Sequence, residues 1–266
     1  MTITLQNDII LLEVDPAFGA RVTSLRDLRT GREWLVQGPA VGDVSDAASY
    51  RGAEARGWDE CFPTVAPCTH PVRGRLRDHG DLWGRPWSAR GEGWLGYDGD
   101  GYSFDRRLTL SGDRVLADYA VTNTAEVPLD WMWSQHCLLD ARPGDRLALE
   151  GIGPLQRTDV PTRVARDGTV LKTYGPVEGP AAATLAGPEG SIRFEWHGDQ
   201  IGHFGLWLDF GGWPEEDPVH QLALEPTTAP ADHLIAAGDD TETLTPGATR
   251  RWRVAIRLAA GARNAP

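Results

Sequence analysis

The sequence predicts an all-β protein, a large antiparallel β-sandwich, and three observations favour this fold class. Hydrophobic residues alternate with polar ones at a period of two in almost every segment where a period can be read. Glycine and proline, with 31 and 19 residues, divide these segments into short stretches. No segment has the 3.6-residue period of an amphipathic helix. Short alternating strands separated by turns are typical of antiparallel sheets that pack face to face.

Four segments show the alternation most clearly. Residues 102–110 and 115–121 each predict a half-buried strand, and the glycine and aspartate of residues 111–114 favour a hairpin turn between them. Residues 192–196 follow the same pattern. In residues 251–258 tryptophan and aliphatic side chains alternate mainly with arginines, which predicts a strand with one buried and one solvent-exposed face.

The sequence predicts one domain over residues 1–266, since it contains no linker-like stretch, repeat or low-complexity block. Two segments, about 38–101 and 154–190, are irregular in pattern. The first is rich in tryptophan, aspartate and arginine, as carbohydrate sites often are. We therefore expect substrate contacts there.

Charge and composition exclude several classes of partner. The formal net charge of −12 disfavours nucleic acid and anionic membranes, and no apolar run approaches the roughly 20 residues of a membrane-spanning helix. The N-terminus lacks a secretory signal and the chain has three cysteines, so we expect a cytoplasmic protein without a disulfide framework. Lys172 is the only lysine, which we attribute to genomic base composition.

Two titratable residues lie on the less bulky faces of predicted strands. In residues 128–136 the tryptophans share one face and His136 lies on the other. In residues 221–226 the leucines share one face, Glu225 lies on the other, and Pro226 is expected to close the strand. From spacing alone, such a histidine is more often a hydrogen-bonded structural residue and such a glutamate is usually just solvated, so a catalytic role needs a more specific signal.

Four segments, in this order, resemble the aldose 1-epimerase (galactose mutarotase) superfamily. Residues 18–34 resemble its opening strand and the "tg-ewl" ending. Asp78-His79-Gly80, followed by Trp87, resembles its "HG…W" loop. Residues 121–136 resemble the strand pair that carries the family's catalytic histidine, and residues 224–232 resemble the "lEP…pd" segment that carries its catalytic glutamate. The resemblance reaches over nearly the whole chain.

The resemblance implies a β-supersandwich that binds a sugar on a concave face. It implies that Glu225 is the general base, His136 the general acid and His79 a substrate-binding histidine. The base would remove the anomeric hydroxyl proton while the acid protonates the ring oxygen, so that the ring opens and closes to the other anomer. An isomerase of this type uses no cofactor and no metal.

The chain departs from the family at the histidine loop. Phosphorylated-sugar relatives carry arginine four residues after the loop histidine, where this chain has Trp83, and Arg85 lies two residues further on. We expect a neutral sugar ring to stack on Trp83, with Arg85 as the alternative ligand of a phosphate. The family's sugar-hydroxyl aspartate has no match in residues 173–190.

The segment 57–64 occupies the place of a family loop and carries an acidic pair beside a tryptophan. Carboxylates accept pairs of sugar hydroxyl protons, so we expect Trp58, Asp59 and Glu60 to be substrate-binding residues. An exposed acidic loop is the alternative.

Metal and nucleotide sites are not predicted. The four residues Cys61, Cys68, His70 and His79 match no zinc spacing, and neither a dinucleotide fingerprint nor a P-loop occurs.

The leading expectation is therefore a mutarotase of a free, neutral aldose. A non-catalytic sugar-binding or sugar-sensing protein and a hexose-6-phosphate mutarotase remain alternatives, while the chain is short for a polysaccharide lyase or hydrolase. The expected partner is a small-molecule sugar, and the expected state is a monomer or homodimer.

Overall fold

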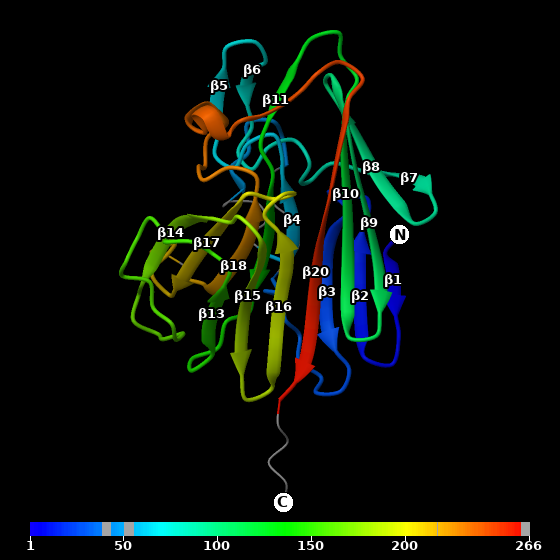
Figure 1. The fold of residues 1–266 in the computed structure, drawn as a ribbon. Coiled ribbons are helices and arrows are strands. Elements are labelled where there is room, and N and C mark those ends of the chain that lie inside the picture. The colour runs from blue at the N-terminus through cyan, green and yellow to red at the C-terminus, as the bar shows by residue number, and fades with distance from the viewer. Residues whose placement is uncertain (39–43, 51–55, 217, 262–266) are drawn as a thin grey trace, which may run out of the picture.

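The protein has an all-β fold, shown here by a computed structural model that describes residues 1–38, 44–50, 56–216 and 218–261 (Figure 1). Within these residues the strands form two eight-stranded antiparallel sheets and two small ones. The first sheet has the order β1 (Ile3–Gln6), β2 (Ile10–Asp15), β3 (Arg21–Asp27), β4 (Trp58–Cys61), β12 (Ser134–Leu139), β18 (His220–Thr227), β17 (His203–Phe210), β14 (Val170–Pro176). The second has the order β13 (Arg146–Glu150), β15 (Pro180–Gly187), β16 (Gly190–His197), β20 (Thr249–Ala260), β10 (Arg114–Asn123), β9 (Tyr102–Ser111), β8 (Trp94–Gly99), β7 (Ser88–Gly91).

The smaller elements lie at the ends of these sheets. They are the two-stranded sheets β11 (Leu129–Trp131) with β19 (Glu242–Leu244) and β5 (Cys68–His70) with β6 (Gly74–Leu76), and the short 3-10 helices η1 (Leu234–Ala236) and η2 (Gly238–Asp240). No helix in the described part of the chain is long and apolar enough to cross a membrane.

The strands predicted from alternation are confirmed. β9 and β10 form the expected hairpin, and β20 (red in Figure 1) pairs with β10 on one side and β16 on the other. The apolar face of β20 is buried in the core, where the Trp252 ring stacks between Tyr119 and Trp131 at centroid distances of 5.4 Å. Burial of this alternating face is what holds the register of the sheet.

The two segments expected to be irregular contain strands. Residues 38–101 include β4 to β8, and residues 154–190 include β14 and β15. Trp58–Cys61 is buried on both faces, so β4 has no apolar–polar alternation to read. Pro226 also does not close its strand, since β18 continues to Thr227.

A buried charged cluster joins the two large sheets between their facing surfaces. Glu60 of β4 accepts hydrogen bonds from Arg106 of β9 at 2.9 Å, Tyr119 of β10 at 3.0 Å and the Trp133 indole at 2.8 Å. Both members of the Glu60–Arg106 ion pair are at most 1% exposed. A buried charge of this kind is tolerated because its hydrogen-bonding capacity is filled.

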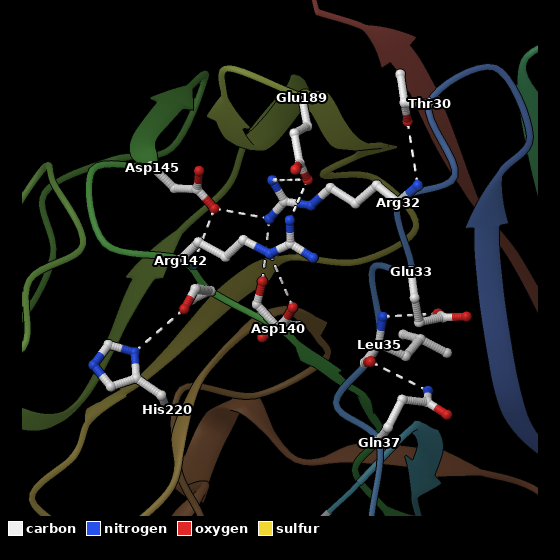
Figure 2. A network of polar contacts seen from close by, with 11 residues as sticks. Thr30, Arg32, Glu33, Leu35, Gln37, Asp140, Arg142, Asp145, Glu189 and His220 are labelled. Carbon is white, nitrogen blue, oxygen red and sulfur yellow. Dashed lines mark hydrogen bonds and ion pairs between the residues drawn. The ribbon is translucent and has the colours of Figure 1, made fainter.

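A second polar network lies where β12 ends (Figure 2). Arg32 donates to Asp145 at 2.8 Å and to the carbonyl oxygen of Asp140 at 3.1 Å, and it lies 4.0 Å from Glu189. Asp140 follows β12 of the first sheet, while Asp145 and Glu189 precede β13 and β16 of the second. The network therefore links the two sheets at this end of the sandwich.

Candidate active site

A cavity of about 340 Å³ lies over the first sheet, on the face turned away from the second sheet. Strands β12, β14, β17 and β18 form its floor, and loops form its walls. Its lining residues are Ser49, Tyr50, Val65, Ala66, Asp78, His79, His136, Leu138, Lys172, Trp207, Trp213, Gln221, Glu225 and Asp232.

The sheet register places His136 and Glu225 side by side. β12 pairs with β18 through Ser134–Thr227 and Leu138–Ala223, which puts His136 opposite Glu225 between these two pairs. The antiparallel pairing therefore brings the two predicted catalytic side chains onto one face, although they are 89 residues apart in sequence.

Glu225 is 1% exposed, and its two carboxylate oxygens have different surroundings. Oε2 forms an ion pair with Lys172 of β14 and accepts a hydrogen bond from Ser134 at 3.4 Å. Oε1 is buried and has no hydrogen-bond partner among the described residues. One oxygen is thus held in place while the other is available to accept a proton.

Gly205 of β17, the cross-strand neighbour of Glu225, gives the carboxylate its space. A Cβ atom at this position would lie 3.0 Å from Glu225 Oε2 and 3.1 Å from Tyr174 Cε1. A larger residue would push either side chain out of place.

His136 is 7% exposed, and burial strongly lowers its pKa. The positive charges of His79, Lys172 and Arg21 lower this pKa further. The ring meets His79 edge-on at a centroid distance of 4.8 Å and Tyr50 at 5.0 Å. In the free protein the imidazole is therefore neutral near pH 7.

His79 is held by a tight loop. It has a positive φ of 56°, followed by Gly80 at 73°, and its backbone N–H donates to Val65 at 2.6 Å. A Cβ atom on Gly80 would lie 2.0 Å from the Phe62 carbonyl oxygen, so only glycine fits there. His79 Nδ1 lies 2.8 Å from Asp78 Oδ1, and this hydrogen bond offsets burial and lowers the pKa of Asp78.

Trp83 and Arg85 do not line the cavity, contrary to the expectation of a sugar stacked on Trp83. Trp83 is fully buried, and its indole donates to the carbonyl oxygen of Asp78 at 2.7 Å. It thereby supports the histidine loop from behind, with the Arg77 guanidinium 3.8 Å from its ring centroid. Arg85 forms an ion pair with the exposed Asp46.

Trp58, Asp59 and Glu60 also lie outside the cavity lining. Trp58 and Glu60 belong to the core face of β4, where the indole donates to the carboxylate at 2.9 Å. Asp59 has the opposite orientation but is 1% exposed, and its Oδ2 accepts from Arg21 at 2.6 Å and from the Tyr50 hydroxyl at 3.0 Å, while its buried Oδ1 has no hydrogen-bond partner among the described residues. These residues lie beneath the site and bond to other protein groups, and β4 is a buried strand, not an exposed acidic loop.

The larger hollow of about 620 Å³ lies on the second sheet and is not a comparable site. Most of its charged lining residues pair with one another: Asp118 with Arg107 at 3.1 Å and with Arg253, and Glu195 with Arg114 at 3.2 Å. None of the predicted catalytic residues lines it.

Comparisons with known proteins agree on the architecture. No protein-family model and no curated protein sequence matches the chain. Solved structures do match over nearly the full length. A galactose mutarotase related enzyme from Lactobacillus acidophilus has a TM-score of 0.75 at 12% identity, covering 100% of both chains. A galactose mutarotase-like protein from Lactobacillus casei has a TM-score of 0.71 at 16% identity, covering 97% of this chain and 100% of its own. The Slr1438 protein from Synechocystis has a TM-score of 0.73 at 17% identity, covering 98% and 96%.

The chain has the galactose mutarotase-like fold. At these identities the likeness establishes the fold, and the chemistry must be argued from the site itself.

Several residues in and beside the cavity were not predicted from the sequence. Lys172 of β14 lines the cavity, and Tyr174, two residues further along β14, lies outside the lining but donates its hydroxyl to the lining residue Asp232 at 2.5 Å. Asp232 belongs to the "EP…PD" segment, so the motif contained a signal for a second cavity carboxylate. Trp207 and Trp213, whose rings meet edge-on at 6.1 Å, add an aromatic wall.

The four potential metal ligands considered in the sequence do not lie together in the structure. Cys61 and His79 lie near His136, with one ligand atom of each within 4.8 Å of the others. Cys68 and His70 have other neighbours, Thr64 at 3.8 Å and Asp130 at 3.6 Å.

Proposed function

We propose that the protein is an aldose 1-epimerase that interconverts the α and β anomers of a neutral sugar. The observation that supports this most is the pairing of His136 with Glu225 on adjacent strands at the floor of one cavity. An acid and a base that lie side by side on the cavity floor can act on two oxygens of one sugar, the anomeric hydroxyl oxygen and the ring oxygen. A protein that only binds sugar has no need of this pair.

The proton balance of ring opening fits the two groups. Glu225 Oε1 takes the proton of the anomeric hydroxyl while a protonated His136 gives one to the ring oxygen, and the bond from C1 to the ring oxygen breaks. The open-chain aldehyde rotates about C1–C2. Ring closure then reverses both transfers, so no proton is gained or lost over the cycle.

The lowered pKa of His136 determines how much of the protein is in the protonation state that ring opening requires. Ring opening in this direction requires His136 as the imidazolium, protonated on both ring nitrogens, and an ionised Glu225. Since burial disfavours the imidazolium, this active form is a minor one in the free protein at pH 7. A minor acid form can still be effective because its proton is easily released to the substrate.

The remaining cavity residues favour a neutral sugar. Among the described lining residues, Asp78, Glu225 and Asp232 supply three carboxylates, against one ammonium group from Lys172. The carboxylates accept sugar hydroxyl protons, and Trp207 and Trp213 offer apolar surface to the ring faces. Lys172 is already paired with Glu225, so no Lys or Arg side chain of the described lining is left for a phosphate.

Anomer exchange by NMR over a panel of sugars tests this proposal. Glucose and galactose should show enzyme-dependent exchange between the α and β signals, with kcat/KM at least about 10-fold above that of their 6-phosphates, because the described lining has no arginine to form a bidentate pair with a phosphate. Ionic strength is held fixed. Faster turnover of a 6-phosphate would reject the neutral-sugar assignment, and binding without exchange would favour a sugar-binding protein.

A further inference from the structure

We infer that Cys61, His79 and His136 form an inhibitory site for one thiophilic metal ion, of which Zn²⁺ is the representative. The binding stands on the geometry of these three residues alone. That the ion inhibits rests on the proposed function, in which His136 must remain free to exchange protons.

The three side chains converge from separate segments. Cys61 ends β4, His79 lies in the tight loop before Gly80, and His136 lies in β12. One ligand atom of each lies within 4.8 Å of the other two. In a tetrahedral zinc site, with Zn–N of about 2.0–2.1 Å and Zn–S of about 2.3 Å, ligand atoms are about 3.3–3.6 Å apart. Side-chain rotations that bring the atoms together by about 1 Å therefore complete the site.

His79 is already oriented as a metal ligand. Its Nδ1 is engaged by Asp78 at 2.8 Å, which leaves Nε2 for the ion, and its ring stacks on Tyr50 at a centroid distance of 4.1 Å. A carboxylate that fixes the far nitrogen of a ligating histidine is the common arrangement in zinc sites, and it raises the basicity of the ligand.

His136 and Cys61 supply the other two ligands. His136 supplies an imidazole nitrogen from β12. Its Nδ1 is buried without a hydrogen-bond partner among the described residues. Cys61 binds as the thiolate, so its thiol releases a proton when the ion is bound.

The ligand set selects the type of ion. One thiolate and two imidazoles suit Zn²⁺, whereas Mg²⁺ and Ca²⁺ require oxygen ligands. Cys61 is itself buried, so the ion reaches it through the cavity that both histidines line, and its open coordination position faces the sugar site. Coordination takes the lone pair through which His136 would exchange a proton, so the metal-bound protein should be inactive.

Zinc competition against a chromophoric chelator tests the site with the full chain. The wild-type protein should bind one Zn²⁺ per chain. Cys61→Ser should weaken binding by about 100-fold or more because the thiolate is lost, and Asp78→Asn by about 10–100-fold through the orientation of His79. Cys68→Ser, which removes a thiol outside the cluster, is the matched control and should bind as the wild type does.

The spectrum of the Co²⁺-loaded wild type adds a test that needs no variant. A thiolate-to-cobalt charge-transfer band is expected, and it should persist in Cys68→Ser. No binding by the wild type, binding unchanged in Cys61→Ser, or loss of the band in Cys68→Ser would overturn the inference.

Because these readouts do not require turnover, they separate this inference from the proposed function. Zinc binding by a protein without anomer exchange would reject the function alone. Exchange that Zn²⁺ does not slow in the wild type would reject the inhibition.

Discussion

His136 shows how strongly one side chain depends on its surroundings. Its pKa is lowered first by burial and then by the positive charges of His79, Lys172 and Arg21. The imidazolium is stable only at a pH below the ordinary value of about 6.5. We therefore expect kcat/KM to fall about tenfold for each unit of pH above 6.5, since the protonated fraction of the free enzyme falls at that rate.

Lys172→Met should raise the pKa of His136, because it removes a positive charge while leaving a side chain of similar length. The decline of kcat/KM should move to higher pH in step. NMR titration of the histidine ring measures the pKa directly, with His197, an exposed residue of β16, as the internal reference. An unchanged or lowered pKa in this variant would contradict the assigned electrostatics.

The sequence predicted the two central residues of the site but not their neighbours. His136 and Glu225 could be placed on strand faces because the adjacent tryptophans and leucines mark the buried side. That Lys172 is the only lysine was attributed to base composition, and no role was predicted for it. The sequence around Lys172 does not show that β14 pairs with β17 and reaches the cavity beside Glu225. Trp83 was expected in the cavity, whereas its burial depends on contacts with Asp78 and Arg77 that only the folded loop creates.

At the scale of the strands, the site depends on a missing side chain at Gly205. Gly205→Ala should keep the fold, because the position needs no positive φ, but should displace Glu225 or Tyr174. We expect kcat to fall about 10- to 100-fold, as misplacements of a catalytic group of this order do. Gly179→Ala, where a Cβ atom meets nothing within 4 Å, is the matched control. Equal rates for the two variants would show that Glu225 does not need this space.

The strands could be predicted from the sequence only where one face is buried and the other is exposed to solvent. This condition holds for β9, β10 and β20, whose alternation is visible in the sequence. It fails for β4, where both faces are covered. The core face of β4 carries Glu60, whose charge is paired with Arg106 from a distant segment. The local sequence does not show this partner, and Glu60 was therefore predicted to bind substrate.

At the scale of the whole molecule, Glu60 links the two sheets. Glu60→Gln leaves Arg106 buried without its counter-ion, which should lower the free energy of unfolding by about 3–5 kcal/mol. Denaturant unfolding measures this loss, and KM of the folded enzyme should be unchanged. A raised KM with unchanged stability would instead restore Glu60 as a substrate ligand.

The account as a whole depends on the pair of His136 and Glu225 at the floor of the cavity. The most direct test is anomer exchange, measured by NMR on a neutral aldose, with the variants His136→Asn and Glu225→Gln. Each should lower kcat by about 10²–10⁴-fold with the fold intact by circular dichroism. His197→Asn and Glu195→Gln, on β16 of the other sheet, are the matched controls and should exchange as the wild type does. Near wild-type exchange in either cavity variant would contradict the acid–base assignment.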